Sequence, residues 1–383
     1  MKNARFSKRL LAVIVSVLIL VGALVVPMTA AASTPIVDTP ITSLDVANGY
    51  AEQSIIKDKK PVMLYGDYYG DNSFAGLVHI RTDGITKLTD GTVGTGSGHA
   101  DFAYSDKVNN DGNNMDKNIR VAWAIDGKAT VTGFMLFNRA TSSSAGDHTE
   151  YEVYVGNDLQ TLFSADNKVH TYTAADGAAF NGVYNEFTNE NIKSGYYVGV
   201  YLLDACSHAD TADCFGNCSY HRISEIAFLG TVDANDKPAY TLDSNFFNHS
   251  IYSPNKAYAT DGEYTYQNSL VNTSNVVIDD TVVFSGNDVV NKAFINDGNI
   301  SNQVEYRSAT GKTVTFELGT VYEISKFSYW HQQSSERKDS YEIYVGNDKD
   351  TLYNDANKVF TWNAATSLRS MRQDVTFNKT PVG

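Results

Sequence analysis

Positive charge is scarce in this sequence. Its 383 residues include 30 lysines and arginines against 44 aspartates and glutamates, which leaves a formal net charge of −14. Nucleic acids and anionic membranes carry dense negative charge and repel an acidic protein. The composition therefore argues against a nucleic-acid partner and against binding to an anionic membrane surface.

The sequence also lacks the short motifs of several enzyme classes. It contains no G-x-S-x-G nucleophile elbow, no H-E-x-x-H metal-binding helix, and no glycine-rich phosphate loop that leads into a helix. Glycoside hydrolysis needs two carboxylates across a cleft, and no pair of acidic residues stands out here. We therefore expect a binding protein and not an enzyme. A catalytic domain beyond Gly383 is the alternative.

Cysteine is rare, and the three that occur lie close together. Cys206, Cys214 and Cys218 share one stretch with His208 and His221. In an exported protein two of the thiols can form a disulfide that closes a loop of about ten residues. Three thiols and two imidazoles can also bind zinc, although their spacing matches no standard zinc pattern. The sequence favours the disulfide over zinc or no defined role, and leaves its pairing open.

The long apolar run of the chain lies at the N-terminus. Basic residues precede it, the run spans residues 10–26, and small residues follow at 29–32. This order is typical of a secretory signal peptide, which we assign to residues 1–32. An uncleaved anchor is the alternative, because about 17 apolar residues approach the length of a membrane span. We expect cleavage, no membrane insertion afterwards, and a secreted or cell-surface location.

Tyrosine is abundant, with 24 residues, and threonine, valine, asparagine, aspartate and glycine recur throughout. Aromatic and β-branched residues favour strands, and the small polar residues favour turns. Long helical patterns are absent. The composition predicts an all-β protein of short strands joined by polar turns.

One stretch of the sequence occurs twice. Residues 151–172 (YEVYVGNDLQTLFSADNKVHTY) align without a gap with residues 341–362 (YEIYVGNDKDTLYNDANKVFTW), and 13 of the 22 positions are identical. A match of this length indicates a duplicated structural unit. Its alternating apolar residues and its Gly-Asn-Asp turn predict a strand followed by a turn. We interpret this repeat as scaffold and expect ligand binding in the loops that differ between the copies.

The repeat predicts two tandem domains. The segments that we predict are a lead-in at 33–44, a first domain at 45–232, a linker at 233–239 and a second domain at 240–383. The second domain has no counterpart of the apolar segment Tyr196–Leu202 of the first domain. We therefore expect it to be truncated, in a sequence that is part of a longer protein with further domains.

Several strands of the first domain can be placed from their patterns. Ile119–Ala124 and Ala129–Phe137 are predicted strands, and Asp126-Gly127 between them is a hairpin signal. Tyr196–Leu202 is apolar on both faces, which predicts a central buried strand. Ile223–Leu229 alternates with polar residues and is the expected closing strand.

The order of these motifs resembles the discoidin domain, also called the coagulation factor V/VIII C-type domain. The chain has an Asp-Gly loop, paired strands, YEVYVGND, the apolar strand YYVGVYL and finally ISEIAFLG. The resemblance covers most of residues 60–230 and 285–383 and includes the bacterial family 32 carbohydrate-binding modules. It implies two antiparallel jelly-roll β-sandwiches of galactose-binding-like fold, the second incomplete. It also implies ligand capture by loops at one end of each sandwich.

The resemblance further implies a structural calcium ion. In the family, the ion is held by the aspartate of the Asp-Gly loop, a serine or threonine about five residues later, and a glutamate of the last strand. The matching residues are Asp90, Thr95 and Glu225, all oxygen donors of the kind that Ca²⁺ requires. In the second domain Asp297 matches the aspartate. The alternative for both aspartates is a turn residue that binds its own backbone.

Sugar binding needs aromatic faces for the apolar side of a pyranose and planar polar groups for its hydroxyls. The candidates lie in loops on the side where the family binds its ligand. In the second domain they are Tyr306, Arg307, Trp330, His331 and Arg337, and in the first they are Asn138, Arg139 and His148. The alternative is that Trp330 is a core residue and that Arg337 is a solvated loop charge.

The sequence therefore predicts non-catalytic binding of a glycan or polysaccharide by an exported, bacterial-type protein. Two alternatives stay open. The chain can be the substrate-targeting part of a larger glycoside hydrolase, or a structural or adhesion protein that binds a protein partner.

Overall fold

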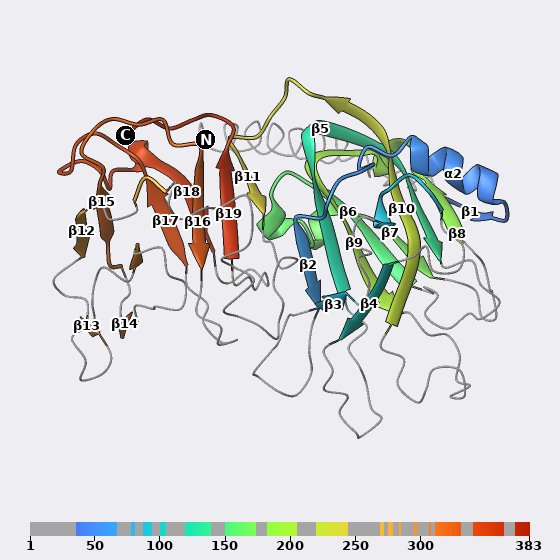
Figure 1. The fold of residues 1–383 in the computed structure, drawn as a ribbon. Coiled ribbons are helices and arrows are strands. Elements are labelled where there is room, and N and C mark those ends of the chain that lie inside the picture. Colours follow the sequence, from blue (N-terminus) through green and yellow to red (C-terminus); the bar gives the residue numbers. More distant parts are fainter. Residues whose placement is uncertain are drawn as a thin grey trace, which may run out of the picture.

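A computed structural model gives the fold (Figure 1). The structure describes residues 36–66, 78–80, 87–93, 100–104, 119–138, 150–173, 182–204, 220–243, 269–271, 275–278, 283–284, 295–296, 306–307, 311–330, 340–363 and 372–383. In this part of the chain, no helix combines the length and the hydrophobicity that a transmembrane span needs. The predicted signal segment 1–32 and the three cysteines lie outside the described residues.

Residues 36–233 form an antiparallel β-sandwich with one α-helix among the described elements. Its elements are β1 (Val37–Ile41), α2 (Leu44–Glu52), β2 (Met63–Gly66), β3 (Val78–Ile80), β4 (Ala100–Tyr104), β5 (Ile119–Asn138), β6 (Glu150–Gly156), β7 (Lys168–Thr173), β8 (Gly182–Glu186), β9 (Lys193–Asp204) and β10 (Tyr220–Asp233), with short 3₁₀ turns at Leu159–Thr161, Ala165–Asn167 and Asn189–Asn191. All pairings between these strands are antiparallel. The all-β, sandwich-like fold expected from the sequence is confirmed.

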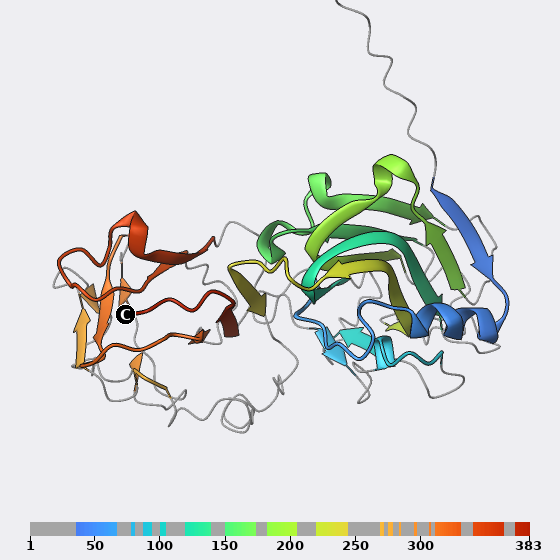
Figure 2. The same ribbon diagram turned by 90° about the horizontal axis from the view of Figure 1, so that it is seen from above.

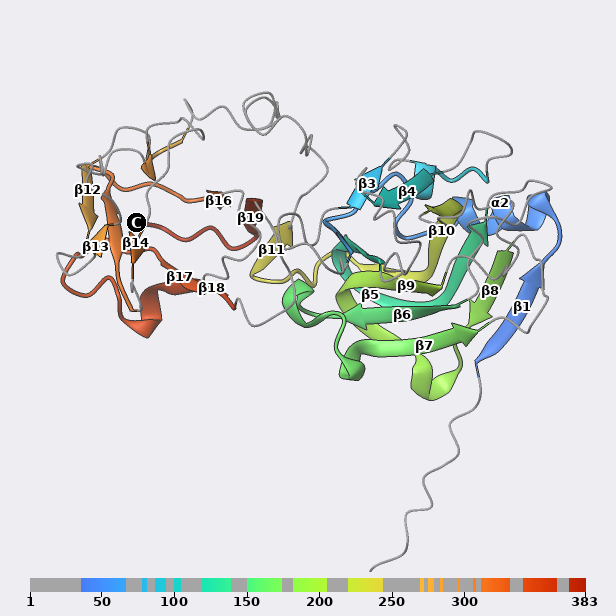
Figure 3. The ribbon, with the colours of Figure 1, turned by 90° about the horizontal axis from the view of Figure 1, so that it is seen from below.

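The sandwich has two layers, and β5 runs through both of them. Its first half pairs with β2 on one side and with β9 on the other, and β6 and β7 extend that layer. Its second half pairs with β8 and β10, and β1, β4 and β3 complete the other layer. Figure 3 shows β9, β6 and β7 side by side in the first layer.

The core between the layers is formed by the alternate side chains of each strand that point inward. Trp123 and Phe134 of β5, Tyr151 of β6, Val200 of β9 and Phe228 of β10 are all fully buried in one cluster. The Phe134 ring lies 4.9 Å from that of Phe228, in an edge-on arrangement. The prediction that Tyr196–Leu202 forms a central buried strand is confirmed, because β9 lies between β5 and β6.

The predicted hairpin at Asp126-Gly127 is wrong. β5 is one continuous strand from Ile119 to Asn138, with a register shift against β9 between Ala124 and Ala129. Gly127 is needed for a close approach and not for a turn. A Cβ atom at Gly127 would lie 2.2 Å from the backbone oxygen of Asp233 at the end of β10. The glycine therefore lets the backbones of β5 and β10 touch.

Gly127→Ala should destabilise the protein by about 1–3 kcal/mol, because the added methyl group collides with backbone that cannot move freely. Gly49 in α2 is the matched control. Nothing lies within 4 Å of a Cβ atom at Gly49, so Gly49→Ala should stabilise the helix by about 0.5–1 kcal/mol. Urea unfolding measures both variants. Equal effects of the two substitutions would contradict the close contact.

Two further elements, which the sequence analysis did not identify, precede β2. β1 pairs with β8, and α2 lies against the outer face of the second layer, as Figure 2 shows. Ala47 and Ala51, one helical turn apart, are fully buried there against Met135. The Tyr50 ring stacks on Tyr184 at 4.2 Å. A nine-residue helix has too short a periodic pattern to be identified from the sequence.

The described residues between 240 and 383 form a second body, whose strands correspond to strands of the first. They are β11 (Tyr240–Asp243), β12 (Asn275–Ile278), β13 (Val283–Phe284), β14 (Tyr306–Arg307), β15 (Val314–Glu317), β16 (Lys326–Trp330), β17 (Tyr341–Tyr344), β18 (Lys358–Trp362) and β19 (Arg372–Phe377), with a 3₁₀ turn at Asp355–Asn357. β11 pairs with β19 and β19 with β16, as β1 pairs with β8 and β8 with β5. No described strand of this body corresponds to β9 or β10.

The repeated sequence folds in the same way in both bodies. The side-chain amide of Asn167 donates to the Thr161 carbonyl at 2.8 Å, and that of Asn357 donates to the Thr351 carbonyl at 2.8 Å. Glu152 and Glu342 likewise each accept a hydrogen bond from the tyrosine two residues later. These contacts stay within the repeat and hold its own turn and strands together, as expected of a scaffold.

The two bodies share one apolar interface. Leu242, Phe360 and Trp362 of the second body pack with Met63 and Leu162 on the outer face of the first layer, and each of these five side chains is almost fully buried. Figures 1 and 3 show β11 of the second body beside the first. The first layer therefore has an apolar partner on each of its faces.

Three hydrogen bonds accompany the interface. The backbone N–H of Leu242 donates to the Tyr197 hydroxyl at 2.8 Å. The Gln160 side-chain amide donates to the Thr361 carbonyl at 3.0 Å, and its oxygen accepts from the backbone N–H of Asn363 at 2.9 Å. These hydrogen bonds fix the position of the second body along the apolar face.

Candidate functional site

Glu225 is an ionisable residue in the middle of a buried strand. It lies in β10 opposite Phe137 of β5, directly after a register shift that begins at Ile223. Its side chain is fully buried, and no side chain in the described part of the chain donates a hydrogen bond to either carboxylate oxygen. Burying an ionised carboxyl group without side-chain partners costs free energy. We therefore expect either a bound ligand or a retained proton at this position.

Two chain segments cover the face on which Glu225 lies. Residues 54–60 follow α2, and residues 87–93 contain the Asp-Gly loop. The backbone N–H of Asp58 donates to the Thr89 carbonyl at 2.6 Å, and the Thr89 hydroxyl donates to the Lys59 carbonyl at 2.7 Å. The backbone N–H of Val93 donates to the side chain of Asn48 in α2 at 2.7 Å. The helix and the two segments therefore hold the Asp-Gly loop in one place.

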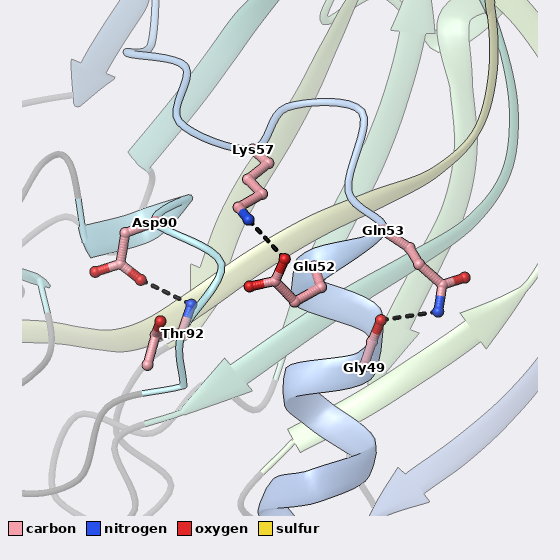
Figure 4. A network of polar contacts seen from close by, with 6 residues as sticks. All are labelled: Gly49, Glu52, Gln53, Lys57, Asp90 and Thr92. Atoms are coloured by element: carbon pink, nitrogen blue, oxygen red, sulfur yellow. Dashed lines mark hydrogen bonds and ion pairs between the residues drawn. The ribbon is translucent and has the colours of Figure 1, made fainter.

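Asp90 has the contact expected of a turn residue and also lies near Glu225. Its Oδ1 accepts a hydrogen bond from the backbone N–H of Thr92 at 2.8 Å, as Figure 4 shows. Gly91 follows with a φ of +80°, a conformation that favours glycine. The negative charge of Asp90 acts on Glu225. Asp90 can therefore be a turn residue and a metal ligand at the same time, although the sequence analysis gave these two roles as alternatives.

The electrostatics of the site favour a cation or a proton. The pKa of Glu225 is raised to about 10, chiefly by burial and next by the negative charge of Asp90, although the backbone N–H of Gly91 partly opposes both. The nearby cation is Lys57, but its Nζ pairs with Glu52 at 2.6 Å (Figure 4). The hydrogen bond to Glu52 is also the main reason that the pKa of Lys57 is raised. Lys57 therefore compensates the negative charge of Asp90 and Glu225 only weakly.

The predicted calcium ligands are only partly within the described residues. Asp90 and Glu225 come together, from segments 135 residues apart in the sequence, while Thr95 and Asp297 lie outside the described residues. Across the described ranges, no cluster of three or more histidine, cysteine, aspartate or glutamate side chains forms a metal site. A calcium ion at Asp90 and Glu225 would therefore need backbone carbonyl or hydroxyl oxygens as further ligands.

Four of the predicted sugar-binding residues lie in the described part of the chain. Asn138 is buried at the end of β5, where it pairs with Ile223 of β10, two residues before Glu225. Tyr306 and Arg307 form β14, and Trp330 ends β16 opposite Arg372. Arg139, His148, His331 and Arg337 lie outside the described residues.

The part that α2 and residues 54–60 play in this site was not predicted from the sequence. Asn48, Lys57 and Asp58 were not candidates, although each contacts or influences the Asp-Gly loop or Glu225. A weak signal was present, because Ser43 precedes a run with Asp45 in its first turn and alanines four residues apart.

Comparisons with known proteins give structural likeness only. No family model and no curated protein matches the chain. Similar solved structures include the family 32 carbohydrate-binding module of EndoD from Streptococcus pneumoniae, at 8% identity over 46% of this chain and 99% of that one, with a TM-score of 0.30. The module CpGH89CBM32-5 from Clostridium perfringens has 11% identity over 44% and 92%, with a TM-score of 0.28.

A lectin from an animal is similar as well. The fucolectin from striped bass (Morone saxatilis) serum has 14% identity over 87% of this chain and 94% of that one, with a TM-score of 0.31. At these TM-scores the fold assignment rests on the strand pairing of this chain itself. The protein is an antiparallel β-sandwich protein that is similar to carbohydrate-binding modules and lectins, the group that the order of its sequence motifs resembles.

Proposed function

We propose that this protein binds glycans without catalysis, outside the cell. The observation that carries the proposal is the junction of the Asp-Gly loop with the buried Glu225 of the closing strand. In the family that the sequence resembles, this junction holds the end of the sandwich at which loops bind sugar. The N-terminal segment 1–32 supports export, and the acidic composition is compatible with an extracellular ligand that carries no dense negative charge.

The ligand loops that we propose follow equivalent strands in the two bodies. In the first body the loop begins after Asn138 and contains Arg139 and His148. In the second it begins after Trp330 and contains His331 and Arg337. A single shallow site binds sugars weakly, and two sites on one rigid chain gain affinity through avidity. Tandem sandwiches thus suit a polymeric or clustered glycan.

His331→Ala and Arg337→Ala should each weaken glycan binding by the second body about tenfold or more, because each removes a charged or polar partner of the sugar hydroxyls. The panel should include GalNAc-β-1,3-galactose, Lewis B antigen and fucose, the sugars bound by or named for the similar structures. Glycan arrays followed by calorimetry measure the change.

Lys349→Ala is the control for charge. Lys349 is 62% exposed and pairs with Glu317 at 3.2 Å, and we expect its loss to leave glycan binding unchanged. Binding that survives both loop substitutions would remove His331 and Arg337 from the site. If no glycan on the panel binds while an extracellular protein does, the chain is an adhesion module instead.

We further propose a structural calcium ion between the Asp-Gly loop and the closing strand. Glu225 supplies a buried carboxylate to which no described side chain donates a hydrogen bond, and Asp90 supplies a second carboxyl group, whose charge acts on Glu225. Both are hard oxygen donors, and Thr95 is the third side chain proposed for the site. A bound ion would neutralise the two negative charges and hold the 87–93 loop against β10.

Calcium at a hundredfold excess over its dissociation constant should raise the free energy of unfolding by about 2.7 kcal/mol, because it binds only the folded state. Glu225→Gln and Asp90→Asn should each abolish most of this gain. Glu190→Gln, at an exposed position, should keep it. Calorimetric titration of the chelated protein and thermal unfolding measure the two quantities. A gain that persists in Glu225→Gln would place the ion elsewhere.

A further inference from the structure

The side chain of Lys57 lies against the Asp-Gly loop. A Cβ atom at Gly91 would lie 2.6 Å from Cε of Lys57 and 3.3 Å from its Nζ. Gly91 is also the residue whose backbone N–H donates to Glu225, and it follows Asp90 directly. The Lys57 ammonium group and the two carboxyl groups of the candidate calcium site therefore adjoin the same glycine.

The ammonium group is held away from these carboxyl groups by an exposed ion pair. Its Nζ lies 2.6 Å from Oε2 of Glu52, whose side chain is 60% exposed, against 32% for that of Lys57. Figure 4 shows the Lys57 side chain pointing toward Glu52 at the end of α2. An ion pair this open to water is weak, so Lys57 can leave Glu52 at little cost.

The backbone that carries Lys57 is fixed to the closing strand. The Ser54 hydroxyl accepts a hydrogen bond from the backbone N–H of Phe228 at 3.2 Å, and the backbone N–H of Ile55 donates to the Phe228 carbonyl at 2.9 Å. The backbone N–H of Lys57 donates to the Ser54 carbonyl at 3.1 Å. Phe228 follows Glu225 by three residues in β10. The part of Lys57 that can move is thus its flexible side chain, whose point charge can turn from one carboxylate to another.

The charges at this place make such a turn favourable. The Lys57 charge and the Glu225 charge already act on each other, and the charge of Asp58 acts on both. An ammonium group that turned from Glu52 toward Asp90 and Glu225 would neutralise part of the charge that a metal ion would otherwise neutralise. Two cations that need the same carboxyl groups exclude each other.

We propose that Lys57 competes with a calcium ion for the carboxyl groups of Asp90 and Glu225, and that Glu52 weakens this competition by holding the ammonium group. The inference rests on the calcium site proposed above. Lys57 and Glu52 are not ligands of the ion. They set the affinity of the site from outside, and they act in opposite directions.

Lys57→Met removes the charge and keeps an unbranched side chain that can lie over Gly91. It should tighten calcium binding by the full chain about threefold to tenfold, because the competing cation is gone. Glu52→Gln should weaken binding by a similar factor, because it releases the ammonium group toward the site. Calorimetric titration of the chelator-treated proteins with calcium, at one pH and one ionic strength, measures the dissociation constants.

The double variant shows whether Glu52 acts through Lys57. Glu52→Gln should have no effect on calcium binding once Lys57→Met is present, since the group that it releases is absent. Lys128→Met is the control for net charge. Lys128 belongs to the same sandwich, is 39% exposed and pairs with Asp236 at 3.6 Å, and its replacement should leave the dissociation constant unchanged.

Several results would overturn the inference. If the wild-type chain binds no calcium, the inference falls together with the calcium site. If the chain binds calcium and both single variants keep its dissociation constant, the site stands and the inference alone falls. Weaker binding by Lys57→Met would make Lys57 a support of the loop. Equal weakening by Glu52→Gln with and without Lys57 would mean that Glu52 attracts the ion directly. Equal tightening by Lys57→Met and Lys128→Met would reduce the effect to net charge.

Discussion

In the presence of a chelator, the protein should lose about 3 kcal/mol of its free energy of unfolding between pH 4 and pH 7. The cause is Glu225, whose pKa is about 10 in the folded protein against an ordinary value of 4.5. A group with a raised pKa binds its proton more tightly in the folded state. Its contribution is complete below pH 4.5 and falls by up to about 1.4 kcal/mol for each pH unit as the pH rises towards 10.

Glu225→Gln is the control for this slope. The amide is neutral at every pH, so the pH dependence due to this position should vanish while the shape of the side chain is kept. Urea unfolding between pH 4 and pH 9 measures the free energies of both proteins. Saturating calcium should remove the loss in the wild-type protein, since the ion favours the ionised carboxylate. Parallel pH profiles of the two chelated proteins would show that Glu225 ionises normally.

Leu242→Ala should cost about 2–5 kcal/mol, the usual range for truncation of a fully buried leucine. Leu242 is 0% exposed and lies in the cluster that contains Met63 and Leu162 of the first body and Phe360 and Trp362 of the second. The truncation opens a cavity at the interface between the two bodies. We expect the cooperative unfolding of the whole chain to separate into two transitions.

Val321→Ala is the matched control in the same body, because Val321 is 60% exposed and its truncation should change stability by less than about 0.5 kcal/mol. Differential scanning calorimetry distinguishes one transition from two. If Leu242→Ala costs no more than Val321→Ala, the interface does not contribute to stability, and the two sandwiches are independent modules.

Much of the first sandwich could be predicted from the sequence. The continuous apolar run at Tyr196–Leu202 predicts a strand buried on both faces, and β9 is that strand. The sequence could not show that the predicted hairpin at Asp126-Gly127 is wrong. A glycine that allows a turn and a glycine that allows two backbones to touch look the same in a sequence. Only the position of Asp233 next to Gly127 distinguishes them.

The candidate calcium site, too, could be predicted from the sequence only in part. Asp90 and Glu225 were chosen through a resemblance, and the fold brings them near each other. The buried state of Glu225 and the engagement of Lys57 by Glu52 could not be predicted, because they depend on a short helix that the sequence pattern did not reveal. Burial and partners, not residue type, set the charge of such a carboxyl group.

By itself, the sequence determined the fold class, the presence of the repeat and the alternation that places Tyr151 and Tyr341 on the inner face of their strands. These are local properties, set by side-chain period and turn chemistry. The tertiary structure decided which of the two tyrosines is fully covered, how the two sandwiches share Leu242, and why Glu225 retains a proton without a metal ion. These are properties of neighbours that are distant in the sequence, and no local pattern records them.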